Sequence, residues 1–154
     1  MNVHQTSFSG QMLERGFWLY VWRIKHKKSS SEYWYIGRTG DSSSANASSP
    51  IGRLSQHLNL KENAKGNSLV RNIKKVGLEP EECQFKLVSI GPIYPEQDNF
   101  DFHVPFRDNV AKLEAEVAYV FRSKGKAVLG NHPRRGEVDR NVLNEILQKF
   151  HGVF

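Results

Sequence analysis

Two runs of aromatic and β-branched residues, close together near the start of the chain, constrain the fold more than any other feature. One run covers Gly16 to Ile24 and the other Glu32 to Arg38. Such side chains suit a pleated, half-buried surface. The basic and serine-rich residues 25–31 between the runs have the composition of a turn. The sequence therefore predicts an antiparallel β-hairpin.

Side chains alternate along a strand, so the sequence also predicts which residues of the first run share a face. One face is expected to carry Trp18, Tyr20, Trp22 and Ile24, and the opposite face Phe17, Leu19 and Val21. All three tryptophans, Trp18, Trp22 and Trp34, are expected in the core rather than stacked on a ligand.

A third strand is predicted at residues 83–90, where apolar side chains again alternate. It begins at Cys83, the only cysteine of the chain. A single cysteine excludes an internal disulfide and a cysteine-based metal cluster, and Cys83 is expected in the core. This cysteine usage fits a reducing, cytoplasmic compartment.

Four helices are predicted from apolar spacing and from start and stop signals. Two short ones cover residues 50–58, starting at Pro50, and residues 68–76, ending before Gly77. Two longer ones run from 108 or 109 to about 123 and over 138–150. Residues 91–107, with three prolines, are expected to form a long loop. The serine-rich residues 40–50 are expected to form a flexible, solvated loop.

These elements predict one mixed α/β (α+β) domain, with a small three-stranded, mainly antiparallel sheet flanked by helices. The 154 residues are the usual size of a single domain. Its core is expected at about 16–131, followed by the C-terminal helix at 138–150. A doubly wound nucleotide-binding fold is not expected, because the strands are few and the glycine-rich phosphate motifs are missing.

The net charge of +6 favours a polyanionic partner. Basic residues that are expected to contact a phosphate backbone are Lys27, Lys28, Arg38, Arg134 and Arg135. No apolar run approaches the ~20 residues that a membrane span requires, and no secretory signal is visible, so a cytoplasmic protein is expected.

Two tyrosine-centred segments resemble the half-motifs that name the GIY-YIG nuclease superfamily. Tyr35-Ile36-Gly37 matches the second half-motif completely, whereas Trp18-Leu19-Tyr20 keeps only the tyrosine of the first. Further elements of the family follow in the right order: Gly52-Arg53-Leu54, then His57, then Ala111-Lys112-Leu113-Glu114, then Asn131. The pair Arg53 and His57 resembles the restriction-enzyme branch. The likeness spans residues 16–131, with a serine-rich insert before Arg53 and a long gap before Asn131.

The resemblance implies a role for each matched residue. Tyr20 would be the general base for an attacking water, or a relay to one, and Tyr35 would orient that water. Arg53 would hold the scissile phosphate, while His57 would share proton transfer or bind phosphate. Glu114 would bind Mg²⁺ or Mn²⁺; Glu116, on the other edge of the same apolar stripe, is its rival. Asn131 completes the implied catalytic set.

The function implied is a metal-dependent endonuclease that hydrolyses the phosphodiester bonds of DNA. A restriction-type enzyme would act as a homodimer, for which the apolar tail 150–154 offers a contact. Three alternatives stay open: a nuclease directed at single strands or RNA, a catalytically silent nucleic-acid-binding module on the same scaffold, and an interaction domain whose charge only aids solubility.

Overall fold

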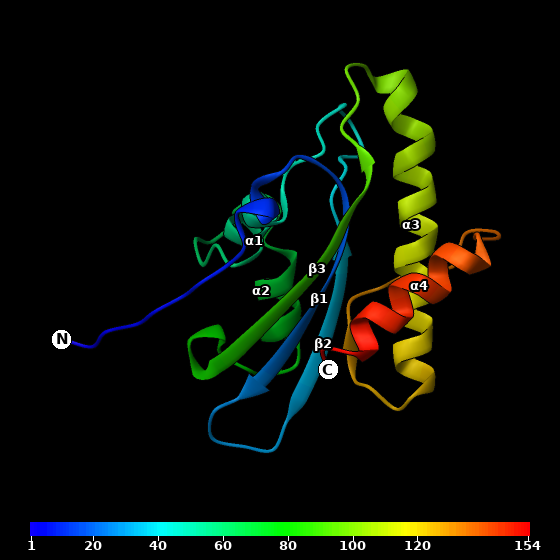
Figure 1. The fold of residues 1–154 in the computed structure, drawn as a ribbon. Coiled ribbons are helices and arrows are strands. Elements are labelled where there is room, and N and C mark those ends of the chain that lie inside the picture. The colour runs from blue at the N-terminus through cyan, green and yellow to red at the C-terminus, as the bar shows by residue number, and fades with distance from the viewer.

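The computed structural model describes all of residues 1–154 and has three layers (Figure 1). The middle layer is a four-stranded sheet in the order β3-β1-β2-β4. Its strands are β1 (Gly16–His26), β2 (Glu32–Arg38), β3 (Cys83–Pro95) and β4 (Val128–Leu129). Helices α1 (Pro50–His57) and α2 (Ser68–Lys75) cover one face, and α3 (Phe100–Ser123) and α4 (Arg140–His151) cover the other. Two short 3-10 helices, η1 (Gly10–Leu13) and η2 (Pro80–Glu82), precede β1 and β3.

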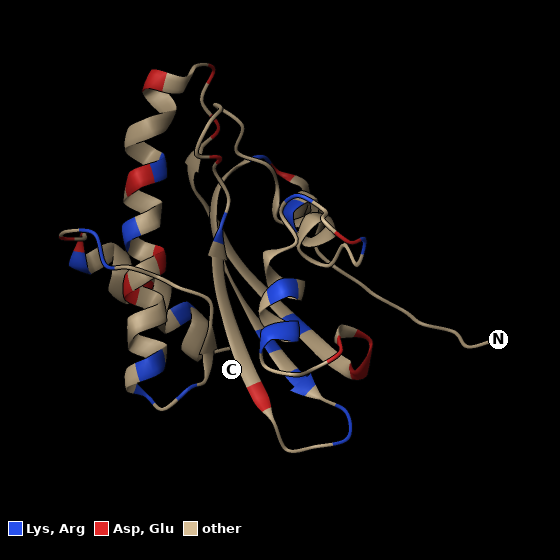
Figure 2. Cartoon of the chain, turned by 180° about the vertical axis from the view of Figure 1, so that it is seen from behind, with Lys and Arg blue, Asp and Glu red and all other residues tan.

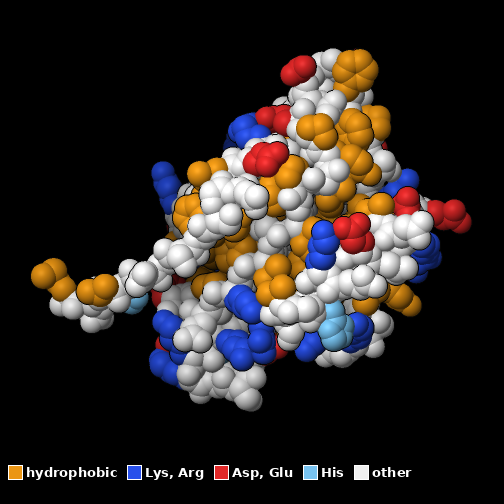
Figure 3. Space-filling view, in the orientation of Figure 1, with side chains coloured by type: hydrophobic (Ala, Val, Ile, Leu, Met, Phe, Trp, Pro, Cys, Tyr) orange, Lys and Arg blue, Asp and Glu red, His pale blue; other side chains and the backbone are white.

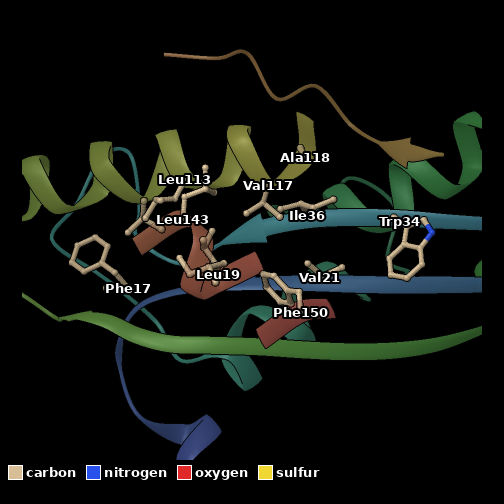
Figure 4. Packing of buried hydrophobic residues seen from close by; sticks show 13 residues of the cluster. Phe17, Leu19, Val21, Trp34, Ile36, Leu113, Val117, Ala118, Leu143 and Phe150 are labelled. Carbon is tan, nitrogen blue, oxygen red and sulfur yellow. The ribbon is translucent and has the colours of Figure 1, made fainter. Parts of the chain in front are cut away.

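The predicted hairpin is present, and β1 pairs with β2 in antiparallel register with Tyr20 opposite Gly37. Both faces of β1 are buried, and its side chains divide as the alternation predicts. Phe17, Leu19 and Val21 pack with α3 and α4, as Figure 4 shows, whereas Tyr20, Trp22 and Ile24 pack with α1 and α2. The three tryptophans and Cys83 are buried, as expected for core residues.

The sheet has four strands, so the prediction of three is wrong in number. The additional strand, β4, is two residues long and pairs in parallel with Trp34 and Tyr35 of β2. Two residues carry no periodicity that a sequence pattern can reveal. Because β4 is so short, the edge of β2 beyond Tyr35 has no strand partner.

The prediction of a long loop at 91–107 is also wrong, since β3 continues to Pro95 and α3 already begins at Phe100. Pro92 is tolerated because β3 is an edge strand that pairs only with β1. Pro105 lies inside α3, where a proline ordinarily argues against a helix. Asn99 caps the start of the helix, since its side chain accepts a hydrogen bond from the backbone N–H of Phe102 at 3.0 Å.

The remaining helices agree with the sequence to within a few residues. Ser49 caps α1 by accepting the backbone N–H of Gly52 at 3.1 Å, and Asp139 caps α4. Phe150, in the last turn of α4, is buried, and after the helix the chain turns back so that the Phe154 ring lies 4.7 Å from that of Trp34. No helix has the length and apolar character needed to cross a membrane.

Candidate active site

Five of the six residues in the implied catalytic set line one polar cavity of about 510 Å³. They are Tyr20, Tyr35, Arg53, His57 and Glu114, contributed by β1, β2, α1 and α3. Further residues of its wall are Gly37, Arg38, Gly40, Asp41, Ser42, Ser43, Lys65, Gly66 and Ser68. The serine-rich loop therefore contributes to the cavity and is not only a solvated insert.

Glycine at position 37 lets the Tyr20 side chain lie flat across β2. Tyr20 and Gly37 are directly opposite in the register of the hairpin. A β-carbon on Gly37 would lie 2.6 Å from Cζ and 2.7 Å from Oη of Tyr20, far inside van der Waals contact. The glycine of Tyr35-Ile36-Gly37 thus has a steric reason, which is to leave room for the tyrosine of the neighbouring strand.

The two tyrosines are joined through a continuous chain of hydrogen bonds. Tyr20 Oη lies 2.6 Å from Nε2 of His57, and Nδ1 of His57 lies 3.0 Å from Oγ of Ser68. The same Ser68 Oγ lies 2.9 Å from Oη of Tyr35. Every member of this chain can both donate and accept a proton when the imidazole is neutral. The arrangement is therefore a proton path that crosses from β1 through α1 and α2 to β2.

Two proton arrangements satisfy this chain, and they run in opposite directions. When Nε2 carries the imidazole proton, it donates to Tyr20, whose hydroxyl then donates to the backbone carbonyl of Arg38 at 3.1 Å. When Nδ1 carries the proton, it donates to Ser68, and Nε2 accepts from Tyr20. In the second arrangement Tyr20 can pass its proton to His57.

Burial sets the ionisation of these groups. It is the main cause that raises the pKa of both Tyr20 and Tyr35, and the Arg53 charge only partly opposes it. Burial, followed by the charge of Arg53, lowers the pKa of His57 to about 4. Near neutral pH the phenols are therefore protonated and the imidazole is neutral, which leaves one ring nitrogen free to accept a proton.

Arg53 brings a positive charge with an unused donor into the cavity. Its Nη1 donates to Oε1 of Gln56 at 2.8 Å, while its Nε is buried and has no hydrogen-bond partner. A buried donor without a partner costs free energy. Because Arg53 also lines the cavity, an anion bound there would meet the positive charge of its guanidinium.

Glu114 reaches the cavity at the open edge of β2. Its carboxylate pairs with Nε of Arg38 at 3.1 Å, and Arg38 also donates to the backbone carbonyl of Gly40 at 2.9 Å. Burial raises the pKa of Glu114 to about 7, although the charges of Arg38 and Arg53 act in the opposite direction. Near neutral pH this carboxyl can therefore lose its proton, and the resulting carboxylate can bind a cation.

The carboxylates of the cavity suit a hard divalent cation that takes its remaining ligands from a substrate. The structure has no group of three or more histidine, cysteine, aspartate or glutamate side chains that could enclose a metal ion. Mg²⁺ is commonly held by one or two carboxylates together with phosphate oxygens and waters. Glu114 would be the protein ligand. Asp41, the other carboxylate in the wall, already accepts hydrogen bonds from Ser44 and Asn46.

The rival glutamate and the candidate asparagine lie elsewhere. Glu116 is buried and forms an ion pair with Arg134, away from the residues that line the cavity. Asn131 is exposed and does not line the cavity either. Its neighbour His132 is half-buried, and its Nε2 hydrogen-bonds to the carbonyl of Ile36 at 3.0 Å. Of these two neighbours, His132 rather than Asn131 is therefore the one that hydrogen-bonds to β2.

The basic residues expected to contact nucleic acid are divided between different surroundings. Arg38 lies inside the cavity. Lys27 and Lys28 are at the far end of the hairpin, where Lys27 donates to the carbonyl of Glu81 and Lys28 pairs with Glu82. That turn is seven residues along the chain from Tyr20, or about 24 Å at ~3.4 Å per residue. Arg134 is held by Glu116, and the charge of Arg135 acts on Glu114.

Three residues that were not predicted from the sequence also line the cavity: Lys65, Gly66 and Ser68. Ser68 is the first residue of α2 and was part of a predicted helix, but nothing in its neighbourhood indicates that it bridges His57 and Tyr35. Only the packing of α2 beside α1 brings it there.

Together these groups can move a proton, hold an anion and bind a cation in one polar cavity. Compared with protein families, with curated proteins and with solved structures, the chain matches none.

Proposed function

We propose that this protein is a metal-dependent nuclease of the GIY-YIG type that hydrolyses phosphodiester bonds of DNA. The observation that carries the proposal is the chain from Tyr20 through His57 and Ser68 to Tyr35, which opens into the same cavity as Arg53 and Glu114. Hydrolysis of a phosphodiester requires a proton acceptor, charge stabilisation and a cation at the leaving oxygen. The cavity offers a residue for each.

Tyr20 acts as a relay rather than as a phenolate base, because burial raises its pKa. Its oxygen accepts a proton from the attacking water while its own proton passes to Nε2 of His57, 2.6 Å away. The neutral imidazole accepts it, with Nδ1–H donating to Ser68. The bound phosphate carries negative charge, which stabilises the imidazolium as it forms.

Arg53 holds the scissile phosphate. Its side chain lines the cavity, and a planar guanidinium matches the geometry of two phosphate oxygens. The same charge stabilises the additional negative charge of the transition state. Arg38 keeps the Glu114 carboxyl at the cavity wall. A divalent cation at Glu114 would supply stabilisation of the leaving oxygen.

The test is incubation of the purified protein with supercoiled plasmid in Mg²⁺, in Mn²⁺ or in EDTA. The wild type should cut only with metal, and Arg53→Gln and Glu114→Gln should each lose this activity. Matched controls are Arg140→Gln and Glu145→Gln, which remove the same charges from exposed positions on α4. Both controls should cut at the wild-type rate.

Discrete fragments would identify a restriction-type enzyme, and cutting confined to single strands or RNA would redirect the substrate. Absence of cutting on plasmid, single-stranded DNA and RNA, with DNA binding retained, would overturn the nuclease proposal in favour of a silent binding module. Cutting retained in both the Arg53 and the Glu114 variant would overturn the site.

A further inference from the structure

A second hollow, of about 630 Å³, continues from the cavity along the segment that joins α1 to α2. We call this hollow the α2 groove; its walls are residues 60–67 together with Val70, Arg71 and Lys74 of α2. Lys65 and Gly66 line both the cavity and the α2 groove. The two hollows are therefore neighbours, and a strand bound in the cavity can extend past Lys65 and Gly66 toward the groove.

The charge of the α2 groove is strongly positive and uncompensated. Its cations are Lys61, Lys65, Arg71 and Lys74, against the single acid Glu62. All four cations are exposed, and none of their side chains makes an ion pair or a hydrogen bond within the protein. In Figure 2 the lysines and arginines of this segment and of α2 are visible, and α2 itself carries no acid.

This contrasts with the basic residues that the sequence singled out. Lys28 and Arg134 are neutralised by Glu82 and Glu116, and Lys27 is bonded to a backbone carbonyl. Pairing with an acid removes most of the attraction that a cation has for phosphate, since the pair is nearly neutral at a distance. The unpaired cations of the α2 groove keep that attraction.

The start of α2 adds to the positive potential. Its N-cap, Asn67, is 5% exposed and makes no capping hydrogen bond from its side chain. The first N–H groups of α2 therefore have no side-chain acceptor, and the helix dipole favours an anion at that end. Arg71 and Lys74 are three residues apart, so they lie on one side of the helix.

We propose that the α2 groove binds the phosphate backbone of DNA on one side of the bond that is cleaved. This inference rests on the proposed function, because a phosphodiester in the cavity is what directs the flanking strand into the groove. Cations that contact phosphate position a nucleic acid without reading its sequence. The groove consequently contributes affinity for any DNA sequence, with a strong dependence on salt.

The test compares two triple variants that remove the same charge. Lys61→Gln, Arg71→Gln and Lys74→Gln alter the groove outside the cavity, whereas Lys124→Gln, Arg140→Gln and Lys149→Gln alter exposed positions elsewhere. Binding of a fluorescent duplex is measured by anisotropy in EDTA at several salt concentrations. The groove triple should bind about tenfold or more weakly, and the slope of log K against log salt should fall by about 2 to 3. The control triple should stay near the wild type.

Cleavage separates binding from catalysis. The groove triple should raise KM while kcat at saturating DNA stays near that of the wild type. Equal affinity of the groove and control triples would overturn the groove assignment, even if the wild type cuts DNA. Loss of affinity in the groove triple alone would support the assignment, even if the wild type cuts nothing and the nuclease proposal falls.

Discussion

The imidazole of His57 lies between two phenol rings, with its Nε2 only 2.6 Å from the hydroxyl of Tyr20. The ring centre of His57 is 5.6 Å from that of Tyr20 and 5.4 Å from that of Tyr35. Both neighbours meet the imidazole edge to face, so the ring cannot rotate freely. This packing fixes Nε2 toward Tyr20 and Nδ1 toward Ser68, and the tautomer of the ring then decides in which direction the proton path runs.

Replacement of Tyr20 with phenylalanine should remove proton transfer while keeping the fold. Because the ring stays in place over Gly37, DNA binding should be unchanged, and single-turnover cleavage should fall by about a hundredfold to ten-thousandfold. Tyr33→Phe is the control, since Tyr33 is on β2 and its hydroxyl makes no hydrogen bond in the structure. Full cleavage by Tyr20→Phe would eliminate Tyr20 as the relay.

Stability should fall in acid because of His57. Its pKa is lowered from 6.5 to about 4, so between these pH values the unfolded chain binds a proton that the folded protein does not. The free energy of unfolding therefore decreases as pH drops from 6.5 to 4, by about 3 kcal/mol at ~1.4 kcal/mol per pKa unit. Chemical denaturation at several pH values gives the free energy of unfolding of the wild type and of His57→Gln. The difference between the two pH curves measures the contribution of His57.

The difference between the two proteins separates the contribution of His57 from that of Glu114, whose effect on stability changes with pH in the opposite direction. The pKa of Glu114 is raised from 4.5 to about 7, so its contribution to stability is present at low pH and is lost as pH rises through 7. Both proteins of the comparison carry Glu114. Parallel curves for the wild type and His57→Gln would show that His57 titrates alike in the folded and unfolded states.

The sequence predicted the parts of the fold that short-range patterns control. Alternation along β1 correctly separated Tyr20 from Leu19, because neighbouring side chains of a strand must face opposite ways. Alternation could not predict β4, because its two residues form a strand only where the chain returns to pair with β2. Pro105 misled the prediction for α3, because packing of a long helix outweighed the local penalty of one proline.

The same distinction applies to the candidate site. Spacing placed Arg53 and His57 on one face of α1, and both line the cavity. Ser68 could not be predicted, because its role depends on how α2 packs against α1. Phe100 and Phe102, at the start of α3 where no helix was predicted, are exposed. Figure 3 shows hydrophobic side chains on the surface at that end of the molecule.

The requirement for Mg²⁺ should depend on pH with a midpoint near 7. A carboxyl must lose its proton to bind the cation, and burial raises the pKa of Glu114 to about 7. The Mg²⁺ concentration for half-maximal cleavage should therefore rise about tenfold per pH unit below 7 and level off above it. Arg38→Gln should move the midpoint to higher pH, since Arg38 lowers that pKa. A midpoint that Arg38→Gln leaves unmoved would assign the pH dependence to another group.

Gly37→Ala should displace the Tyr20 ring. The new β-carbon would lie 2.6 Å from Cζ of Tyr20, and relief of that overlap must break the contact with His57. Thermal unfolding should show a loss of about 1–3 kcal/mol, typical of overpacking, and cleavage should fall as in Tyr20→Phe. Gly10→Ala is the control, because a β-carbon there meets nothing within 4 Å. Unchanged stability and cleavage in Gly37→Ala would mean that the hairpin relaxes freely at this pair.

Ser68→Ala tests whether the proton path extends beyond His57. Ser68 Oγ lies 3.0 Å from Nδ1 of His57 and 2.9 Å from the hydroxyl of Tyr35, so its loss separates the two. Without that partner, the His57 tautomer that accepts a proton from Tyr20 loses its hydrogen bond at Nδ1. Single-turnover cleavage should therefore fall about ten- to a hundredfold, the range typical for loss of a partner that orients a histidine ligand. DNA affinity should not change.

A threonine at position 68 keeps the hydroxyl, so Ser68→Thr should recover most of the activity that Ser68→Ala loses. Ser55→Ala serves as a matched control, because the hydroxyl of Ser55 donates only to the backbone carbonyl of Gly52 on α1. If Ser68→Ala cleaves at the rate of Ser55→Ala, the path ends at His57, and Tyr35 acts on the water independently of it. If Ser68→Ala is slow and Ser68→Thr is not, the hydroxyl itself holds His57 in the accepting tautomer.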